Sequence, residues 1–186
     1  NEADDRLRDL FFNHGFDHKI NHDLRKQFTR FYILLMENQK KENFTRLTSI
    51  KDVAIKHFID SIIVDKLTPL KFPLLDMGTG PGFPGIPLKI MLGPEKKIIL
   101  AEGVQRRVNF LKKVRSELSL ENLEIIGRNV NEDFHYPVQG VITRAVEETR
   151  NTMANVMNCL QTGGCIYLMK GPNVDPEIKM ALDTWG

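Results

Sequence analysis

The sequence predicts a mainly parallel, doubly wound α/β sheet that follows an N-terminal helical segment. Three observations support this prediction. In residues 1–66, apolar residues recur at three-to-four spacing, which is typical of amphipathic helices. From Pro69 onward, short apolar runs alternate with helical patterns, as they do in βαβ units. The first of these runs ends in an acid and a glycine cluster, and ligands bind at such strand ends in doubly wound sheets.

The N-terminal segment contains two amphipathic stretches. The apolar face of the first consists of Leu24, Phe28, Phe31, Tyr32, Leu34 and Leu35. The second stretch, residues 52–67, repeats the pattern with Val53, Ile55, Phe58, Ile59, Ile62 and Ile63. The polar residues 42–51 between them predict a loop. We therefore expect a helical unit at residues 1–66 and an α/β domain at residues 67–186.

Five short apolar runs predict the strands of the sheet. They are residues 72–76, 98–101, 123–126, 140–143 and 165–169. Helices are expected at residues 106–118 and 151–160, and another just before Trp185. Gly163-Gly164 predicts a turn before the last strand. Because the carboxyl ends of parallel strands meet at one edge, the residues that follow these strands are expected to form the functional site.

The composition narrows the possible functions. A net charge of +2 does not by itself indicate a nucleic-acid binder. Cys159 and Cys165 form neither a disulfide framework nor a metal-ligand spacing, which favours a reducing compartment. His14, His18 and His22 share a four-residue spacing, but no acid or cysteine motif accompanies them. With no long apolar run and no secretory signal, we expect a cytoplasmic protein without a membrane span or a metal.

The loop after the first strand carries the candidate cofactor residues Asp76, Gly78, Thr79, Gly80 and Gly82. Residues 80–85 match G-x-G-x-x-G, the dinucleotide fingerprint. The carboxylate of Asp76, however, would repel a pyrophosphate. S-adenosylmethionine has no phosphate and carries an ammonium and a sulfonium, so Asp76 suits its methionine amine. Glu102, at the end of the second strand, would accept the ribose hydroxyls of either cofactor.

Two other functions stay open at this point. One is an NAD(P)-dependent oxidoreductase, from the literal glycine fingerprint. The other is a non-catalytic RNA-binding or ribosome-assembly protein. A mere tight turn explains the glycines less well, because Asp76, three spaced glycines and Glu102 coincide in a βαβ context. The chain contains no G-x-x-x-x-G-K-[ST] motif, which argues against a P-loop nucleotidase.

Six blocks occur in a fixed order between about Leu34 and Gly171. They are Asn43-Phe44-Thr45, His57-Phe58-Ile59-Asp60-Ser61, the loop from Leu75 through Gly85-Ile86-Pro87-Leu88, Arg106-Arg107 with Phe110-Leu111, Thr143-Arg144-Ala145 and Leu168-Met169-Lys170-Gly171. In these blocks the chain resembles the bacterial 16S rRNA guanine-N7 methyltransferases, the glucose-inhibited division protein B family.

The resemblance implies a Rossmann-like class I methyltransferase domain with S-adenosylmethionine as cofactor. It also implies a partner, 16S rRNA or the small ribosomal subunit, and methylation of one guanine at N7. We expect a monomer. The strands that complete the family's sheet at its C-terminal end are expected to be missing from residues 67–186.

The resemblance also implies roles for individual residues. Four of them would surround the cofactor: Gly78, Phe83, Val130 and Asn131. The last two would lie beside its adenine. Arg144 would sit at the junction of cofactor and substrate, and Lys170 would face the RNA or the base.

The chemistry of guanine N7 suits these residues. N7 has a free lone pair and no proton, so it attacks the methyl group without a general base, and catalysis depends mainly on positioning. Arg and Lys pair naturally with guanine O6 and N7. The hypothesis is that Arg144 or Lys170 holds O6 and leaves N7 free.

Two further features allow a functional and a structural interpretation. The densest basic region contains Lys96, Lys97, Arg106, Arg107, Lys112, Lys113 and Arg115. Such a run is either a solvated helix face or a contact surface for RNA phosphates. His57 and Asp60 lie three residues apart on an expected helix. We favour a structural role for them, bracing the helical segment against the sheet.

Overall fold

The computed structural model describes residues 2–16, 18–42, 52, 54–144, 149–170 and 177–180. The predicted blocks at Asn43-Phe44-Thr45, Ala145 and Gly171 lie outside these residues, as does the loop predicted between the two amphipathic stretches. Within the described part of the chain, no helix is both long and apolar enough to cross a membrane.

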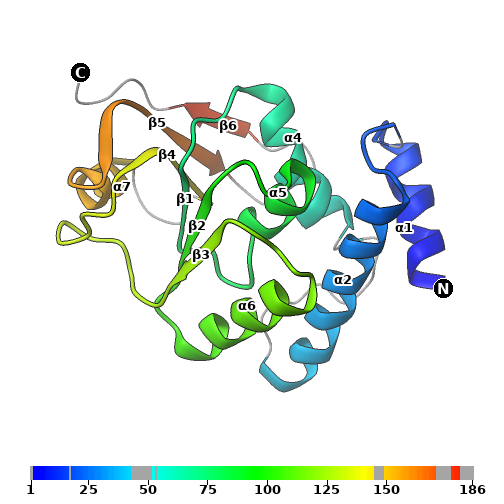
Figure 1. The fold of residues 1–186 in the computed structure, drawn as a ribbon. Helices are drawn as coiled ribbons and strands as arrows, with labels where there is room; N and C mark the ends of the chain where they lie inside the picture. Colours follow the sequence, from blue (N-terminus) through cyan, green and yellow to red (C-terminus); the bar gives the residue numbers. More distant parts are fainter. Residues whose placement is uncertain are drawn as a thin grey trace.

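The chain folds around a six-stranded sheet (Figure 1). Its strands are β1 (Leu74–Met77), β2 (Ile98–Ala101), β3 (Leu123–Ile126), β4 (Val138–Arg144), β5 (Leu160–Lys170) and β6 (Glu177–Met180). They lie in the order β3-β2-β1-β4-β5-β6. The first five are parallel, and β6 pairs antiparallel with β5. The strand order reverses between β1 and β4, which is where doubly wound sheets bind ligands.

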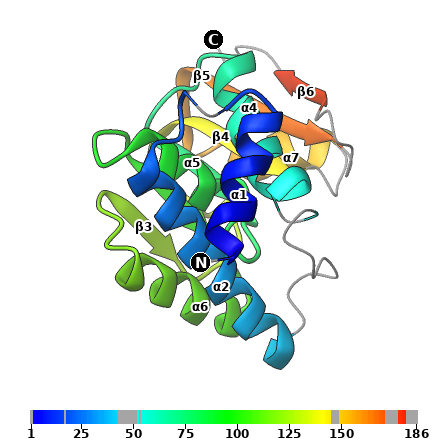
Figure 2. The same cartoon turned by 90° about the vertical axis from the view of Figure 1, so that its right-hand side faces the viewer.

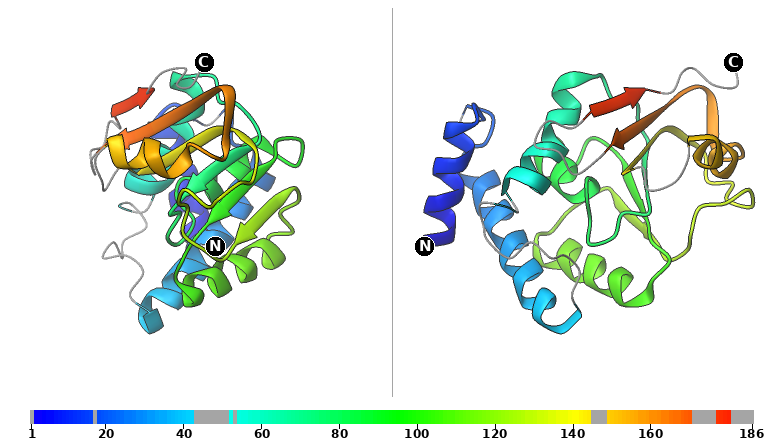
Figure 3. Two further views of the ribbon diagram at one scale, coloured as in Figure 1. Left: turned by 90° about the vertical axis from the view of Figure 1, so that its left-hand side faces the viewer. Right: turned by 180° about the vertical axis from the view of Figure 1, so that it is seen from behind.

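The described helices fall into an N-terminal group and a group that connects the strands. They are α1 (Glu2–Asn13), α2 (His22–Glu42), the π-helical turn η1 (Ala54–Ile59), α4 (Asp60–Leu67), α5 (Gly85–Leu92), α6 (Gln105–Glu117) and α7 (Thr149–Val156). Figures 1 and 3 show α1 and α2 side by side at one end of the molecule, and α7 at the other. In Figure 2, α1 lies in front and the sheet lies behind the N-terminal helices.

The sheet has a buried core on each face, because side chains alternate along each strand. Leu74, Ile98, Ile142 and Tyr167 point to the face covered by the N-terminal helices, α4, α5 and α6. Their neighbours in sequence point to the other face, where they pack with α7 and the loop after β3. The helical segment therefore shares one hydrophobic core with the sheet, and the division at residues 66 and 67 stays a prediction.

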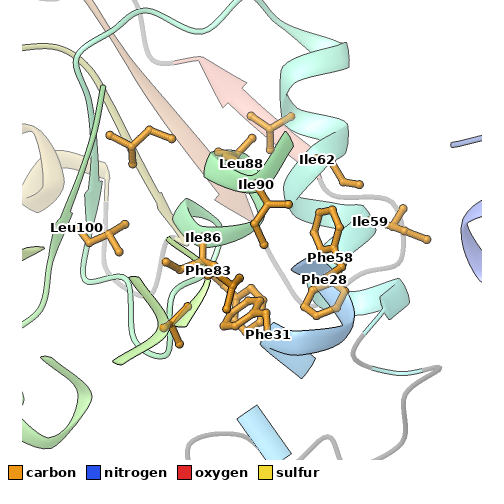
Figure 4. Packing of buried hydrophobic residues seen from close by; sticks show 14 of the residues in the cluster. Phe28, Phe31, Phe58, Ile59, Ile62, Phe83, Ile86, Leu88, Ile90 and Leu100 are labelled. Carbon is orange, nitrogen blue, oxygen red and sulfur yellow. The ribbon is translucent and has the colours of Figure 1, made fainter. Parts of the chain in front are cut away.

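An aromatic cluster joins the helical segment to the loop after β1 (Figure 4). Phe28 and Phe31 come from α2, Phe58 from η1 and Phe83 from the loop. The ring centroid of Phe31 lies 5.6 Å from that of Phe58 and 5.5 Å from that of Phe83. Aromatic pairs in this range each contribute about 0.5–1.5 kcal/mol beyond area burial. The cluster thus fixes the loop against the N-terminal helices.

The structure differs from the sequence predictions in two segments before β2. The helical pattern at residues 52–67 is confirmed, but the helix is not α-helical throughout. The helix expected at residues 52–67 contains the π-helical turn η1 before α4 begins at Asp60. Residues 85–88, interpreted as loop, begin the helix α5. Most of α5 is buried on all sides, so its sequence has no amphipathic period. Pro87 occupies the first turn, where a missing N–H costs no intrahelical hydrogen bond.

Predictions for other segments also need correction. The helix expected at residues 151–160 ends at Val156, and β5 begins at Leu160. Gly163-Gly164 lies inside β5, next to a shift in its register with β4. The segment before Trp185 contains the strand β6 rather than a helix in its described part. His14, His18 and His22 do not share a helix, because α1 ends at Asn13 and α2 begins at His22.

Candidate functional site

The glycine loop, residues 78–85, leaves the carboxyl end of β1 and crosses to β2. The backbone N–H groups of Gly78 and Thr79 donate to the carbonyl of Ala101, at 3.0 and 3.1 Å. Gly78 and Gly80 have φ values of +67° and +61°, which side chains other than glycine rarely adopt. A Cβ at either residue would meet no atom within 4 Å. The loop therefore presents bare backbone to open space at the switch point of the sheet.

Asp76, in β1, stabilises this loop through hydrogen bonds. The side chain points to the face of the sheet that the helices cover and is only 1% exposed. Its Oδ2 accepts hydrogen bonds from the Thr79 hydroxyl at 2.6 Å and from the Gly85 N–H at 2.8 Å. Its Oδ1 is buried and accepts none. Burial raises the pKa of Asp76 to about 7, although both hydrogen bonds and the charge of Arg144 oppose the rise. The acid thus has one buried oxygen available to a cationic donor.

Gly85 is expected to tolerate no side chain. A Cβ there would overlap Leu100 Cδ2 and lie 2.8 Å from Asp76 Oδ2. Gly85→Ala should therefore lower the free energy of unfolding by about 1–3 kcal/mol, the usual range for overpacking. Gly127→Ala is the matched control, because its Cβ would lie 3.7 Å from Val108 in ordinary contact. Urea denaturation of the two variants measures the difference, and equal midpoints would contradict this account of the loop.

Glu102 connects the glycine loop to the loop after β2. Its Oε1 accepts a hydrogen bond from the Gly80 N–H at 2.9 Å, and its Oε2 accepts one from the Val104 N–H at 2.8 Å. The Arg107 guanidinium lies 3.9 Å from Oε1. The side chain is 5% exposed. A carboxylate has about four acceptor positions, so Glu102 can hold the loops together and still accept hydroxyl donors.

The loop after β3 forms the next wall of the site. Val130 is buried in the core of the second face. Asn131 is exposed, and its Oδ1 accepts hydrogen bonds from Arg128 and from the Asp133 N–H, both at 2.9 Å. A Cβ at Gly103 would overlap the Asn129 side chain, so the loops after β2 and β3 are in contact. The family resemblance implies that Val130 and Asn131 lie beside the cofactor adenine. Both lie at the same edge of the sheet as Glu102.

Arg144 ends β4 and points beneath the helical segment. Its Nη1 donates a hydrogen bond to His57 Nδ1 at 3.0 Å, and its guanidinium lies 5.5 Å from the ring centroid of Phe83. Burial lowers the pKa of Arg144, whereas the charges of Asp76 and Asp60 raise it. A guanidinium stays protonated throughout the physiological range. The guanidinium of Arg144 is therefore a permanent cation under the influence of two carboxylates, Asp76 in β1 and Asp60 in α4.

Phe83 belongs to the glycine loop and is only 4% exposed. The His57 ring stacks on it with centroids 4.3 Å apart and planes 16° apart. The contacts of His57 with Phe83 and Arg144 agree with the structural role favoured from the sequence. The same contacts connect His57 to two predicted site residues, and the sequence did not predict this connection. The H-x-x-D-S block was the available signal.

Lys170 is the last residue of β5. The register pairs Arg144 with Met169, so the backbone of Lys170 lies one residue beyond the end of β4. The two predicted catalytic residues thus occupy neighbouring strand ends. The side chain of Lys170 lies outside the described part of the chain.

The members of the basic region lie in different surroundings. Lys96 and Lys97 lie over the rings of Phe72 and Tyr136, and Arg115 donates to the carbonyl of Leu123. Three members are exposed on α6: Arg106, Lys112 and Lys113. These three share one exposed helix face and stay candidates for a shared contact with RNA phosphates.

The site fits S-adenosylmethionine better than a dinucleotide. The buried Asp76 Oδ1 suits an ammonium, the open space above Gly78 and Gly80 accepts a ligand against bare backbone, and Glu102 can accept hydroxyls. A pyrophosphate at the same loop would face the Asp76 carboxylate. Among the described residues, no three His, Cys, Asp or Glu side chains gather as metal ligands.

Solved structures share the fold at low sequence identity. An S-adenosylmethionine-dependent methyltransferase from Aquifex aeolicus aligns with a TM-score of 0.53 and 18% identity, over 73% of this chain and 71% of that one. An S-adenosylmethionine-dependent O-methyltransferase from Thermotoga maritima aligns with a TM-score of 0.51 and 19% identity, over 73% and 49%. These alignments confirm the predicted Rossmann-like fold class.

Relatives in sequence are much closer. The chain is 64% identical over 185 residues to ribosomal RNA small subunit methyltransferase G 2 of Bdellovibrio bacteriovorus, which covers 100% of this chain and 72% of the relative. It is 38% identical over 169 residues to ribosomal RNA small subunit methyltransferase G of Clostridium tetani, covering 86% and 70%. The family described as GidB, rRNA small subunit methyltransferase G, matches residues 24–185. The chain therefore belongs to the rRNA small subunit methyltransferase G family, as its sequence blocks predicted.

Proposed function

We propose that this chain transfers the methyl group of S-adenosylmethionine to N7 of a guanine in 16S ribosomal RNA. One observation supports the cofactor most strongly: Asp76 has a buried oxygen without a donor, beneath a glycine loop that faces open space. Membership of the methyltransferase G family supports the ribosomal RNA substrate. The choice of guanine N7 rests on the family resemblance. It also agrees with the chemistry, because N7 carries no proton and its methylation needs no general base.

The residues predicted for the cofactor have proposed parts in holding it, with Arg144 at the junction of cofactor and substrate. Asp76 binds the methionine ammonium, and Glu102 binds the ribose hydroxyls. Val130 and Asn131 contact the adenine. The remaining loop residues shape the pocket: Gly78, Thr79, Gly80, Gly82 and Phe83. When bound, S-adenosylmethionine supplies a methyl group activated by a sulfonium.

The protein contributes position rather than proton transfer. Guanine N7 carries no proton, so no side chain needs to act as a base. Arg144 or Lys170 holds the base through O6 and leaves N7 free. An in-plane contact is favoured because the guanine ring becomes cationic as it accepts the methyl group. Positioning of this kind contributes several kcal/mol to a reaction of two bound partners.

The proposed partner is 16S rRNA, free or assembled into the small ribosomal subunit. Arg106, Lys112 and Lys113 on the exposed face of α6 are proposed to contact RNA phosphates. Such a substrate implies action in the cytoplasm. Action as a monomer stays a prediction.

Labelled S-adenosylmethionine tests this function directly. Small subunits from cells that lack the modification should accept one labelled methyl group per particle, and fully modified subunits should accept none. Thermal shifts with S-adenosylhomocysteine and NAD separate the alternatives. Stabilisation by S-adenosylhomocysteine alone supports the proposal, whereas stabilisation by NAD alone would favour an oxidoreductase. A protein that neither compound stabilises, and that transfers no label, would instead fit a non-catalytic RNA-binding role.

A further inference from the structure

We propose that His57 is a positioning residue for methyl transfer, which acts by holding the Arg144 guanidinium away from Asp76. The inference rests on the proposed function, because it assigns His57 a part in placing the arginine that holds guanine. His57 lies 87 residues from Arg144 in the sequence, in the helical segment rather than in the sheet.

The hydrogen bond between the two side chains defines the state of the imidazole. The guanidinium has only donors, so Arg144 Nη1 donates and His57 Nδ1 accepts across 3.0 Å. A ring nitrogen that accepts a hydrogen bond carries no proton. His57 is therefore neutral, with its proton on Nε2. Protonation at Nδ1 would remove the acceptor and place a second cation beside Arg144.

Two further contacts hold His57 in place. Its ring stacks on Phe83, which belongs to the glycine loop. Its backbone carbonyl accepts a hydrogen bond from the Ser61 hydroxyl at 2.5 Å. Between these contacts, η1 makes a π-helical turn, a feature that is frequent at functional sites. The histidine thus connects the cofactor loop to the end of β4.

The charges around Arg144 explain why it needs such a tether. The carboxylates of Asp76 and Asp60 both attract the guanidinium. Asp76 Oδ1 is buried and has no donor. Without an acceptor at His57, these charges would draw the guanidinium toward the carboxylates, and Asp76 is the one proposed to bind the cofactor ammonium. His57 therefore keeps Arg144 directed at the substrate and leaves Asp76 to the cofactor.

Substitutions can separate the acceptor from the ring. His57→Phe keeps an aromatic ring against Phe83 and removes the acceptor. His57→Asn removes the ring and places an amide oxygen close to the position of Nδ1. We expect His57→Phe to lower kcat for transfer to small subunits at least about 10-fold, the effect of losing one hydrogen bond to a charged group. His57→Asn should recover most of that loss, even where its melting temperature is the lower of the two.

A double-mutant cycle with Arg144→Ala completes the test. If His57 acts through Arg144, then His57→Phe should cause no further loss of kcat in the Arg144→Ala background. Full additivity of the two losses, or kcat of His57→Phe equal to that of the wild type, would overturn the role of His57 alone. Absence of transfer by the wild-type protein would overturn the proposed function and this role with it.

Discussion

Asp76→Asn is expected to weaken S-adenosylmethionine binding about 10- to 100-fold, because it removes a charge-assisted hydrogen bond to the ammonium. The asparagine oxygen can still accept from Thr79 and Gly85, so the loop should keep its shape. Isothermal titration of the two proteins with S-adenosylmethionine measures the change. Asp65→Asn on the exposed side of α4 is a matched control that should bind as the wild type does.

The pH dependence of binding gives a second readout of the same substitution. Burial raises the pKa of Asp76 to about 7 in the free protein. The ammonium binds the ionised carboxylate, so binding near this pH releases a proton. Wild-type affinity should therefore rise between about pH 6 and pH 8, and the rise should be absent from Asp76→Asn. Parallel pH profiles for the two proteins would contradict a contact between Asp76 and the ammonium.

In the free protein, the contribution of Asp76 to the free energy of unfolding should fall with rising pH, whereas the affinity for the cofactor should rise. The folded-state pKa of Asp76 lies above its unfolded value, so the folded state holds the proton more tightly. This contribution to stability is complete below about pH 4 and is lost as the pH rises through about 7. Over that window it amounts to about 4 kcal/mol at most, and Asp76→Asn should lack it.

Arg144→Ala is expected to lower kcat about 100- to 1,000-fold, the range seen when one preorganised donor is removed from an active site. Affinity for S-adenosylmethionine should change only a few-fold, because Asp76 and Glu102 stay in place. Arg144→Lys should recover part of the rate, since it keeps the charge but not the planar fork of donors. Single-turnover transfer to small subunits, with titration of the cofactor, separates the two effects.

A distant arginine provides the control for this prediction. Arg8 lies exposed on α1 and pairs with Asp5 at 3.6 Å. Arg8→Ala should transfer methyl groups at the wild-type rate. If Arg144→Ala kept the full rate and the full cofactor affinity, Arg144 would have no part in the site.

Features that depend on neighbours in the sequence could be predicted from it. Asp76 and the glycines that follow it lie within a few residues of each other, and each strand of the parallel sheet is a short apolar run. The cofactor class follows from these local patterns. The strand β6 could not be predicted, because its four residues include Glu177 and Lys179 and have no apolar run.

Features that depend on the fold could not be predicted in the same way. The helix α5 is buried on all sides, so no periodic pattern marks it. The bond from Gly80 to Glu102 and the bond from Arg144 to His57 join residues far apart in the chain. Sequence blocks indicated that both His57 and Arg144 matter. Only the packing of η1 over the end of β4 brings them together.

The most direct test of the central claim locates the methyl group within the RNA. Small subunits that lack the modification are incubated with the protein and S-adenosylmethionine. The 16S rRNA is then reduced with borohydride and treated with aniline, which cleaves the strand at N7-methylguanine. The proposed function predicts one new cleavage at a single guanine, absent without the cofactor and strongly reduced with Arg144→Ala. A methyl group that is incorporated but gives no cleavage, or no incorporation at all, would contradict it.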